Sequence, residues 1–92
     1  MPKFLIEATH EKETIACARA IQAFLRTGSH FLTRADWGCK DGIHKAWITV
    51  DVDTKEEARN ILPPHYRSDA TITQLNYFTL DEIDELLQYH NG

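Results

Sequence analysis

The chain is poor in the residues that mark specialised protein classes. Its 92 residues include two cysteines, one methionine, three prolines and four glycines. Two cysteines are too few for a disulfide framework, and they do not form a redox Cys-x-x-Cys motif. No apolar run approaches the roughly 18–20 residues that a membrane-spanning helix needs, so no membrane partner is expected. These absences predict one globular domain over residues 1–92.

Basic residues are also fewer than acidic residues. Ten Lys and Arg face fourteen Asp and Glu, which gives a formal net charge of −4. A phosphate backbone attracts a basic surface, so nucleic acid is not expected as a partner. The N-terminal segment lacks the apolar stretch of a secretory signal, and a cytoplasmic location with reduced cysteines is therefore predicted.

Hydrophobic periodicity predicts seven elements in the order strand, helix, strand, strand, helix, strand, helix. Capping boxes that begin at Thr54 and Thr79 indicate the starts of the second and third helices. The strands are expected at 3–8, 30–39, 43–52 and 69–78, and the helices at 11–28, 54–64 and 79–90.

The two central strands are predicted to form a hairpin. Asp41-Gly42 separates two alternating runs, and this dipeptide favours the tight turns that need positive φ. A two-residue loop places Trp37 opposite Ala46 and Cys39 opposite His44, and a four-residue loop at 40–43 gives the same pairing. In this register the odd-numbered side chains before the turn share one face with the even-numbered ones after it.

The first six elements have the order of the split βαβ unit, so the chain resembles ferredoxin-like proteins, and in particular the dimeric α/β-barrel group. This α+β fold, with the pattern βαββαβ, has an antiparallel four-stranded sheet of order 4-1-3-2. Two helices cover one face of the sheet, and a C-terminal helix is added here. The resemblance implies a homodimer in which the other faces of two sheets meet.

That uncovered face is expected to be partly apolar. A monomer rarely exposes a patch of this size, so a homodimer through this face is predicted, with a monomer covered by its own third helix as the alternative. The expected patch consists of Leu5, Leu32, Trp47, Leu75 and Tyr77.

Charged side chains on the same face allow two interpretations. Arg34 and Asp36, with their neighbours on the facing strand, could form only cross-strand ion pairs. Alternatively, they line a pocket in which Arg34 holds an anionic ligand and Trp47 forms an apolar wall, with Tyr77 beside it.

If the chain is an enzyme, the resemblance suggests isomerisation or cofactor-independent oxygenation of a small organic acid. His30 or Glu7 would then move the proton. The alternative is a non-catalytic domain for ligand sensing or protein interaction. The sequence does not decide whether there is a reaction.

The remaining cysteines and histidines are interpreted as structural. Cys39 and His44 face each other beside the turn, but zinc needs four protein donors, or three and a water. No metal and no cofactor are therefore expected. Cys17 lies on the apolar stripe of the first helix, where a small core residue fits, and His10 and His65 are expected in surface loops.

Overall fold

The computed structural model describes residues 1–91, with side chains through His90, and has an α+β architecture. None of the described helices is long and apolar enough to cross a membrane. The strands are β1 (Lys3–Thr9), β2 (Asp36–Trp37), β3 (Lys45–Asp51) and β4 (Thr71–Leu75); the helices are α1 (Thr14–Arg26), α2 (Lys55–Ile61) and α3 (Leu80–Asn91). Short 3₁₀ turns are η1 (Leu32–Arg34), η2 (Cys39–Asp41) and η3 (Pro64–Tyr66).

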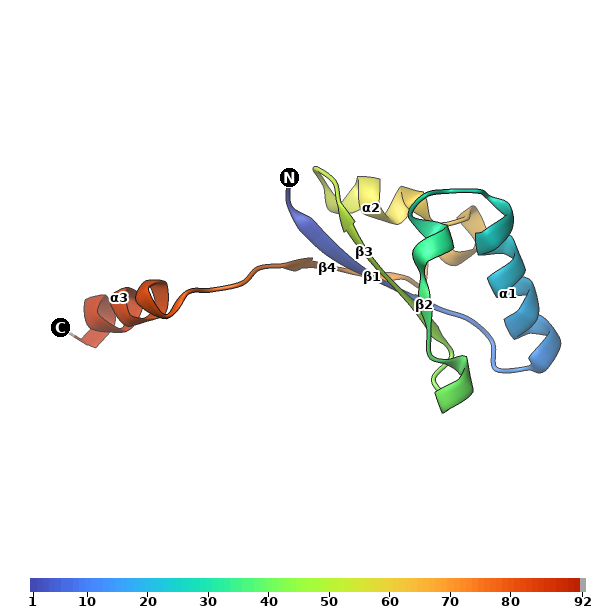
Figure 1. Ribbon diagram of the computed structural model, residues 1–92, viewed down its shortest axis with the longest axis horizontal. Helices are drawn as coiled ribbons and strands as arrows, with labels where there is room; N and C mark the ends of the chain where they lie inside the picture. The colour runs from blue at the N-terminus through green and yellow to red at the C-terminus, as the bar shows by residue number, and fades with distance from the viewer. Residues whose placement is uncertain (92) are drawn as a thin grey trace.

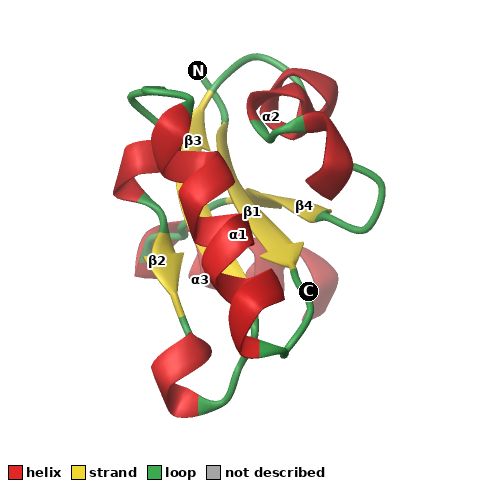
Figure 2. Cartoon of the chain, turned by 90° about the vertical axis from the view of Figure 1, so that its right-hand side faces the viewer, coloured by secondary structure: helices red, strands yellow, loops and turns green. Residues whose placement is uncertain are grey.

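The four strands form one antiparallel sheet of order β2-β3-β1-β4, which is the predicted order read from the opposite edge. Helices α1 and α2 lie on one side of this sheet (Figure 2). Alternate residues of the central strands point under them and are buried, as the two-residue period of a strand requires. These residues are Phe4, Ile6 and Ala8 of β1, and Ala46, Ile48 and Val50 of β3.

Phe24 anchors α1 to the sheet. Its side chain is 1% exposed, and its ring packs edge-on against Trp37, with centroids 4.9 Å apart, and against Tyr66 at 5.5 Å. Such pairs add to the burial of a large apolar surface. The core therefore lies between α1, α2 and the covered face of the sheet.

The hairpin register is confirmed, but the predicted strand at 30–39 is wrong over most of its length. Trp37 pairs with Ala46 as expected, yet only residues 36 and 37 form β2. Ser29 explains the loss, because its Oγ accepts hydrogen bonds from the backbone N–H groups of Phe31 and Leu32. Serine in this role starts a helical turn, so the chain enters η1 instead of extending along β3.

The apolar patch expected on the uncovered face changes accordingly. Leu32 is 1% exposed and belongs to the core, so its predicted place on that face is wrong. Leu5 and Trp47 alternate with buried neighbours, and both are half-buried on the uncovered side; Leu75 of β4 is also half-buried. Tyr77 lies beyond the end of β4 and is 89% exposed.

Helix α3 stands away from the rest of the chain. Residues 76–79 form an extended connector that continues the direction of β4, and α3 follows at its far end (Figure 1). The predicted cap at Thr79 is present, since its Oγ1 accepts a hydrogen bond from the N–H of Glu82 at 3.2 Å. The chain therefore measures 58 × 28 × 20 Å, and α3 does not cover its own sheet.

Candidate metal centre

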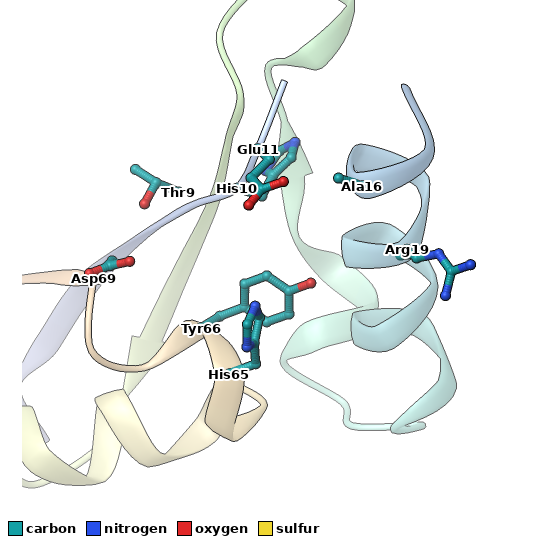
Figure 3. Close-up of a pocket in the computed structure, with 8 residues that line it drawn as sticks. All are labelled: Thr9, His10, Glu11, Ala16, Arg19, His65, Tyr66 and Asp69. Atoms are coloured by element: carbon teal, nitrogen blue, oxygen red, sulfur yellow. The ribbon is translucent and has the colours of Figure 1, made fainter. Parts of the chain in front are cut away.

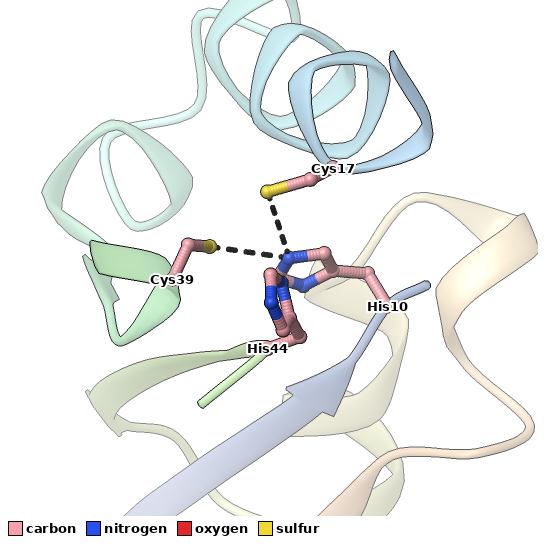
Figure 4. A group of neighbouring side chains, drawn as sticks. All are labelled: His10, Cys17, Cys39 and His44. Carbon is pink, nitrogen blue, oxygen red and sulfur yellow. Dashed lines mark hydrogen bonds between the residues drawn. The ribbon is translucent and has the colours of Figure 1, made fainter. Parts of the chain in front are cut away.

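Four metal-ligating side chains meet at one end of the sheet: His10, Cys17, Cys39 and His44. One donor atom from each lies within 4.8 Å of the other three. Nε2 of His10 is 3.2 Å from Sγ of Cys17 and 3.2 Å from Sγ of Cys39 (Figure 4). The four residues come from four separate segments, so the cluster exists only in the folded chain.

The register of the two central strands brings the histidines together. Thr9 pairs with Lys45 in the β1–β3 ladder, which makes His10 and His44 the next opposing positions. The backbone N–H of His10 donates to the carbonyl of His44 at 3.1 Å. Both continue the buried series of their strands, and their rings lie edge to face with centroids 5.3 Å apart.

Cys39 reaches the cluster because the hairpin curls at its tip. Gly38 donates its N–H to the carbonyl of Lys45 at 3.1 Å, which extends the β2–β3 pairing by one position. The chain then forms η2 and leaves it through Gly42, whose φ of 80° suits a residue without a Cβ. This turn places the Cys39 side chain over the covered face, opposite His44 as predicted.

Cys17 of α1 is the fourth member of the cluster. It lies on the buried stripe of α1 with Ala20 and Phe24, one and two turns further along the helix. Because these residues bury against the sheet, the Cys17 thiol points down at the end of β1. Its side chain is 9% exposed. The prediction of a core cysteine is therefore right about burial, but it missed the polar neighbours.

The surroundings favour uncharged donors in the metal-free protein. Burial lowers the pKa of His10 below its ordinary 6.5, and the neighbouring His44 lowers it further. Burial also raises the pKa of the Cys39 thiol above its ordinary 9.0, and the hydrogen bond with Cys17 adds to this effect. Nδ1 of His10 and Nδ1 of His44 are buried with no hydrogen-bond partner in the described residues.

The arrangement fits a tetrahedral ion. Zinc lies about 2.3 Å from thiolate sulfur and about 2.0 Å from imidazole nitrogen, so its four donors are about 3.3–3.8 Å apart. The two sulfur–nitrogen distances of 3.2 Å at His10 are close to this range, and the 4.8 Å limit for all pairs leaves only a small contraction. Two cysteines and two histidines are also a donor set that zinc commonly takes.

A hollow of about 370 Å³ borders the cluster on the far side of the His10 ring. Figure 3 shows Asp69 and Tyr66 reaching into it from the segment around η3, with Ala16 of α1 opposite. The hollow reaches His10, and its lining carries the charges of Glu11, Arg19 and Asp69. Its lining residues are Thr9, His10, Glu11, Ala16, Arg19, His65, Tyr66 and Asp69.

The predicted ligand site does not gather in one place. Glu7 and Trp47 do meet on the uncovered face, where Nε1 of Trp47 donates to the Glu7 carboxylate at 3.0 Å. Asp36 pairs with Trp47 across β2 and β3. His30 and Arg34 instead line a separate hollow of about 210 Å³ beside β3.

Tyr77 lies apart from both groups on the connector to α3. Binding or conversion of an organic acid by these residues stays a prediction.

Sequence reasoning missed His10 and Cys17 as partners of Cys39 and His44. The predicted hairpin places Cys39 opposite His44, but the hydrophobic patterns do not give the register between β1 and β3. That register carries the missing signal, because it adds His10 to the same end of the sheet. The apolar stripe of α1 then supplies Cys17 on the side that faces it.

Fold and site together define a small α+β protein with a candidate centre of two cysteines and two histidines. No family model matches the chain, and neither does any curated protein or solved structure.

Gly38 provides a test of how the hairpin positions Cys39. A Cβ at this residue would lie 2.7 Å from the carbonyl oxygen of Ile43 and 2.7 Å from the Trp47 ring. We expect Gly38→Ala to cost about 1–3 kcal/mol of folding free energy and to weaken zinc binding, because η2 must shift. Urea unfolding and zinc titration measure the two effects.

Gly28→Ala is the matched control. Gly28 differs from Gly38 in having a positive φ, 67°, but nothing lies within 4 Å of its added Cβ and it is remote from the cluster. This variant should lose about 1 kcal/mol of stability and keep its zinc affinity. Equal zinc affinities in the two variants would contradict the positioning role of Gly38.

The metal-free protein should be most stable between pH 6.5 and 9.0. Below 6.5 the unfolded chain protonates His10 more readily than the folded chain, so stability falls as the pH falls. Above 9.0 the unfolded chain ionises Cys39 first, so stability falls as the pH rises. Urea midpoints between pH 5 and 10 measure this dependence. A His10→Gln variant with an unchanged acid limb would contradict the assignment.

Proposed function

We propose that this protein binds one zinc ion through Cys17, Cys39, His10 and His44, and that the ion fixes the end of the sheet to α1. The observation that carries the proposal is the convergence of four donors from four segments, with Nε2 of His10 at 3.2 Å from both sulfurs. Thiolate and imidazole together select zinc over magnesium or calcium, which prefer oxygen donors.

A catalytic cysteine–histidine pair is the main rival interpretation. Such a pair needs a thiolate whose pKa is depressed by an adjacent imidazolium. Here the pKa of Cys39 is raised and the pKa of His10 is lowered, so both shifts oppose that ion pair. One imidazole nitrogen also faces two thiols, which suits a shared ion better than activation of one nucleophile.

Four protein donors leave no open position for substrate, so the proposed centre is of the structural kind. His10 follows β1, and His44 precedes β3. Cys17 lies in the first turn of α1, and Cys39 lies in η2. One ion would therefore cross-link the covering helix, a central strand and the short hairpin. The hairpin needs such support, because β2 contributes only two residues to the sheet.

Zinc binding by untagged protein, purified under reducing conditions, tests the proposal. Native mass spectrometry should find one zinc ion per chain, and His10→Ala should weaken zinc binding by more than about 100-fold. His65→Ala is the matched control, because His65 is an exposed histidine at the nearby hollow and should keep wild-type affinity. Wild-type protein that binds no zinc, or a His10→Ala variant that binds as the control does, would refute the proposal.

A further inference from the structure

Helix α3 carries an apolar stripe that has no partner among the described residues of its own chain. Leu80, Ile83 and Leu87 recur at helical spacing, with Leu86 beside them. Leu80 is 75% exposed, and Leu86 and Leu87 are about half exposed. A helix of 12 residues is marginal in water by itself, so packing against another surface must stabilise it.

The second unpartnered surface is the uncovered face of the sheet. Leu5, Trp47 and Leu75 lie on it, on the central strands and β4, and all three are half-buried. Helices α1 and α2 occupy only the opposite side (Figure 2). Each chain therefore has one apolar helix face and one apolar sheet face, and no other described residues cover either of them.

The exposed area has the size that a stable interface needs. The chain exposes 6858 Å², whereas a compact protein of 10.6 kDa exposes about 5,500 Å². The excess is about 1,400 Å², and a stable dimer buries about 800 Å² on each partner. The radius of gyration agrees, since 16.9 Å exceeds the roughly 12 Å of a compact domain of this length.

Acidic side chains are concentrated on α3, whereas the uncovered sheet face carries both signs of charge. Four of the fourteen acidic side chains lie on α3, which has no Lys or Arg, so the remaining residues balance at ten acidic and ten basic. Lys3 and Lys45 belong to the alternate series of β1 and β3 that faces the uncovered side, where Glu7 and Asp51 of the same series balance their charge. An acidic helix docked there would place its carboxylates near these two amines.

We propose that α3 of each copy docks its apolar stripe on the uncovered sheet face of a second copy, in a reciprocal exchange of arms. The connector carries α3 beyond the end of its own sheet (Figure 1), so the arm reaches a neighbouring molecule without reversing. A two-fold pair satisfies both surfaces of both chains at once. The chain is again a homodimer, as predicted, but its subunits meet by helix-on-sheet contact instead of sheet-on-sheet contact. This dimer does not depend on the metal.

Light scattering of the full chain, with two neighbouring charge insertions on α3, tests this inference. Leu87→Asp places a carboxylate on the apolar stripe and should raise the dimer dissociation constant by at least about 30-fold. Gln88→Asp adds the same charge on the polar side of the helix and should leave the dimer intact. Circular dichroism of each variant checks that the fold is kept. A wild-type monomer, a larger assembly, or a dimer indifferent to Leu87→Asp would overturn the proposal, and the last result would favour direct sheet packing.

Carbodiimide cross-linking of mixed isotope-labelled and unlabelled chains identifies the docked surface. It joins carboxylates to amines, and α3 has carboxylates but no lysine. We expect cross-links from α3 to Lys3 or Lys45 between light and heavy copies. Cross-links confined to single copies would show that α3 folds back on its own sheet, and would overturn the exchange.

Discussion

In the same excess of zinc, Cys39→Ser protein should melt about 15 °C or more below wild-type protein. A ligand at 1,000 times its dissociation constant stabilises a folded chain by about 4 kcal/mol. In a domain of this size each kcal/mol changes the melting temperature by about 4–8 °C. Serine keeps the shape of cysteine but is a poor zinc ligand, so the variant loses this contribution. Scanning calorimetry at fixed free zinc measures the difference.

The metal-free forms of the same two proteins provide the control. Without zinc, Cys39 contributes hydrogen bonds with His10 and Cys17 that a serine hydroxyl can replace, so wild-type and Cys39→Ser protein should melt within a few degrees of each other. An equally large gap in metal-free protein would assign the effect to packing. Wild-type protein that melts at the same temperature with and without zinc would contradict a stabilising ion.

Phe24→Ala should remove about 3–5 kcal/mol of folding free energy, which is a large share of the total stability of a small domain. Phe24 is 1% exposed and fills the space between α1, Trp37 and Tyr66, so truncation leaves a cavity there. Urea unfolding of the metal-free protein measures the loss.

Phe78→Ala is the matched control for this truncation. Phe78 lies on the connector and is 67% exposed, so the same loss of a ring should change stability by less than about 0.5 kcal/mol. Similar losses in the two variants would contradict the placement of the core between α1 and the sheet.

The long-range arrangement of the sheet could be predicted because it follows from alternation and handedness. The pairing of Trp37 with Ala46 follows from the alternating runs on either side of Asp41-Gly42, and the strand order follows from right-handed crossovers in the split βαβ unit that the chain resembles. Residues 30–35 could not be placed in the same way. Their alternating pattern indicates a strand, but Ser29 offers the backbone a local hydrogen-bonded turn that competes with strand pairing, and alternation alone does not reveal this competition.

Two of the four residues of the candidate centre were predicted to face each other, although no metal was expected there. Cys39 and His44 are close in sequence, and one turn brings them together. His10 and Cys17 join them through strand pairing and helix packing, which depend on the whole fold. The order of elements, and the ferredoxin-like resemblance that rests on it, give no register for β1. A residue such as His10, placed one position beyond a strand, therefore looks like a loop histidine.

X-ray absorption at the zinc edge of the zinc-loaded protein tests the central claim most directly. The account predicts two sulfur neighbours at about 2.3 Å and two nitrogen neighbours at about 2.0–2.1 Å, with the imidazole scattering of two histidines. A first shell of only oxygen and nitrogen, or of one sulfur, would contradict a centre built from Cys17, Cys39, His10 and His44.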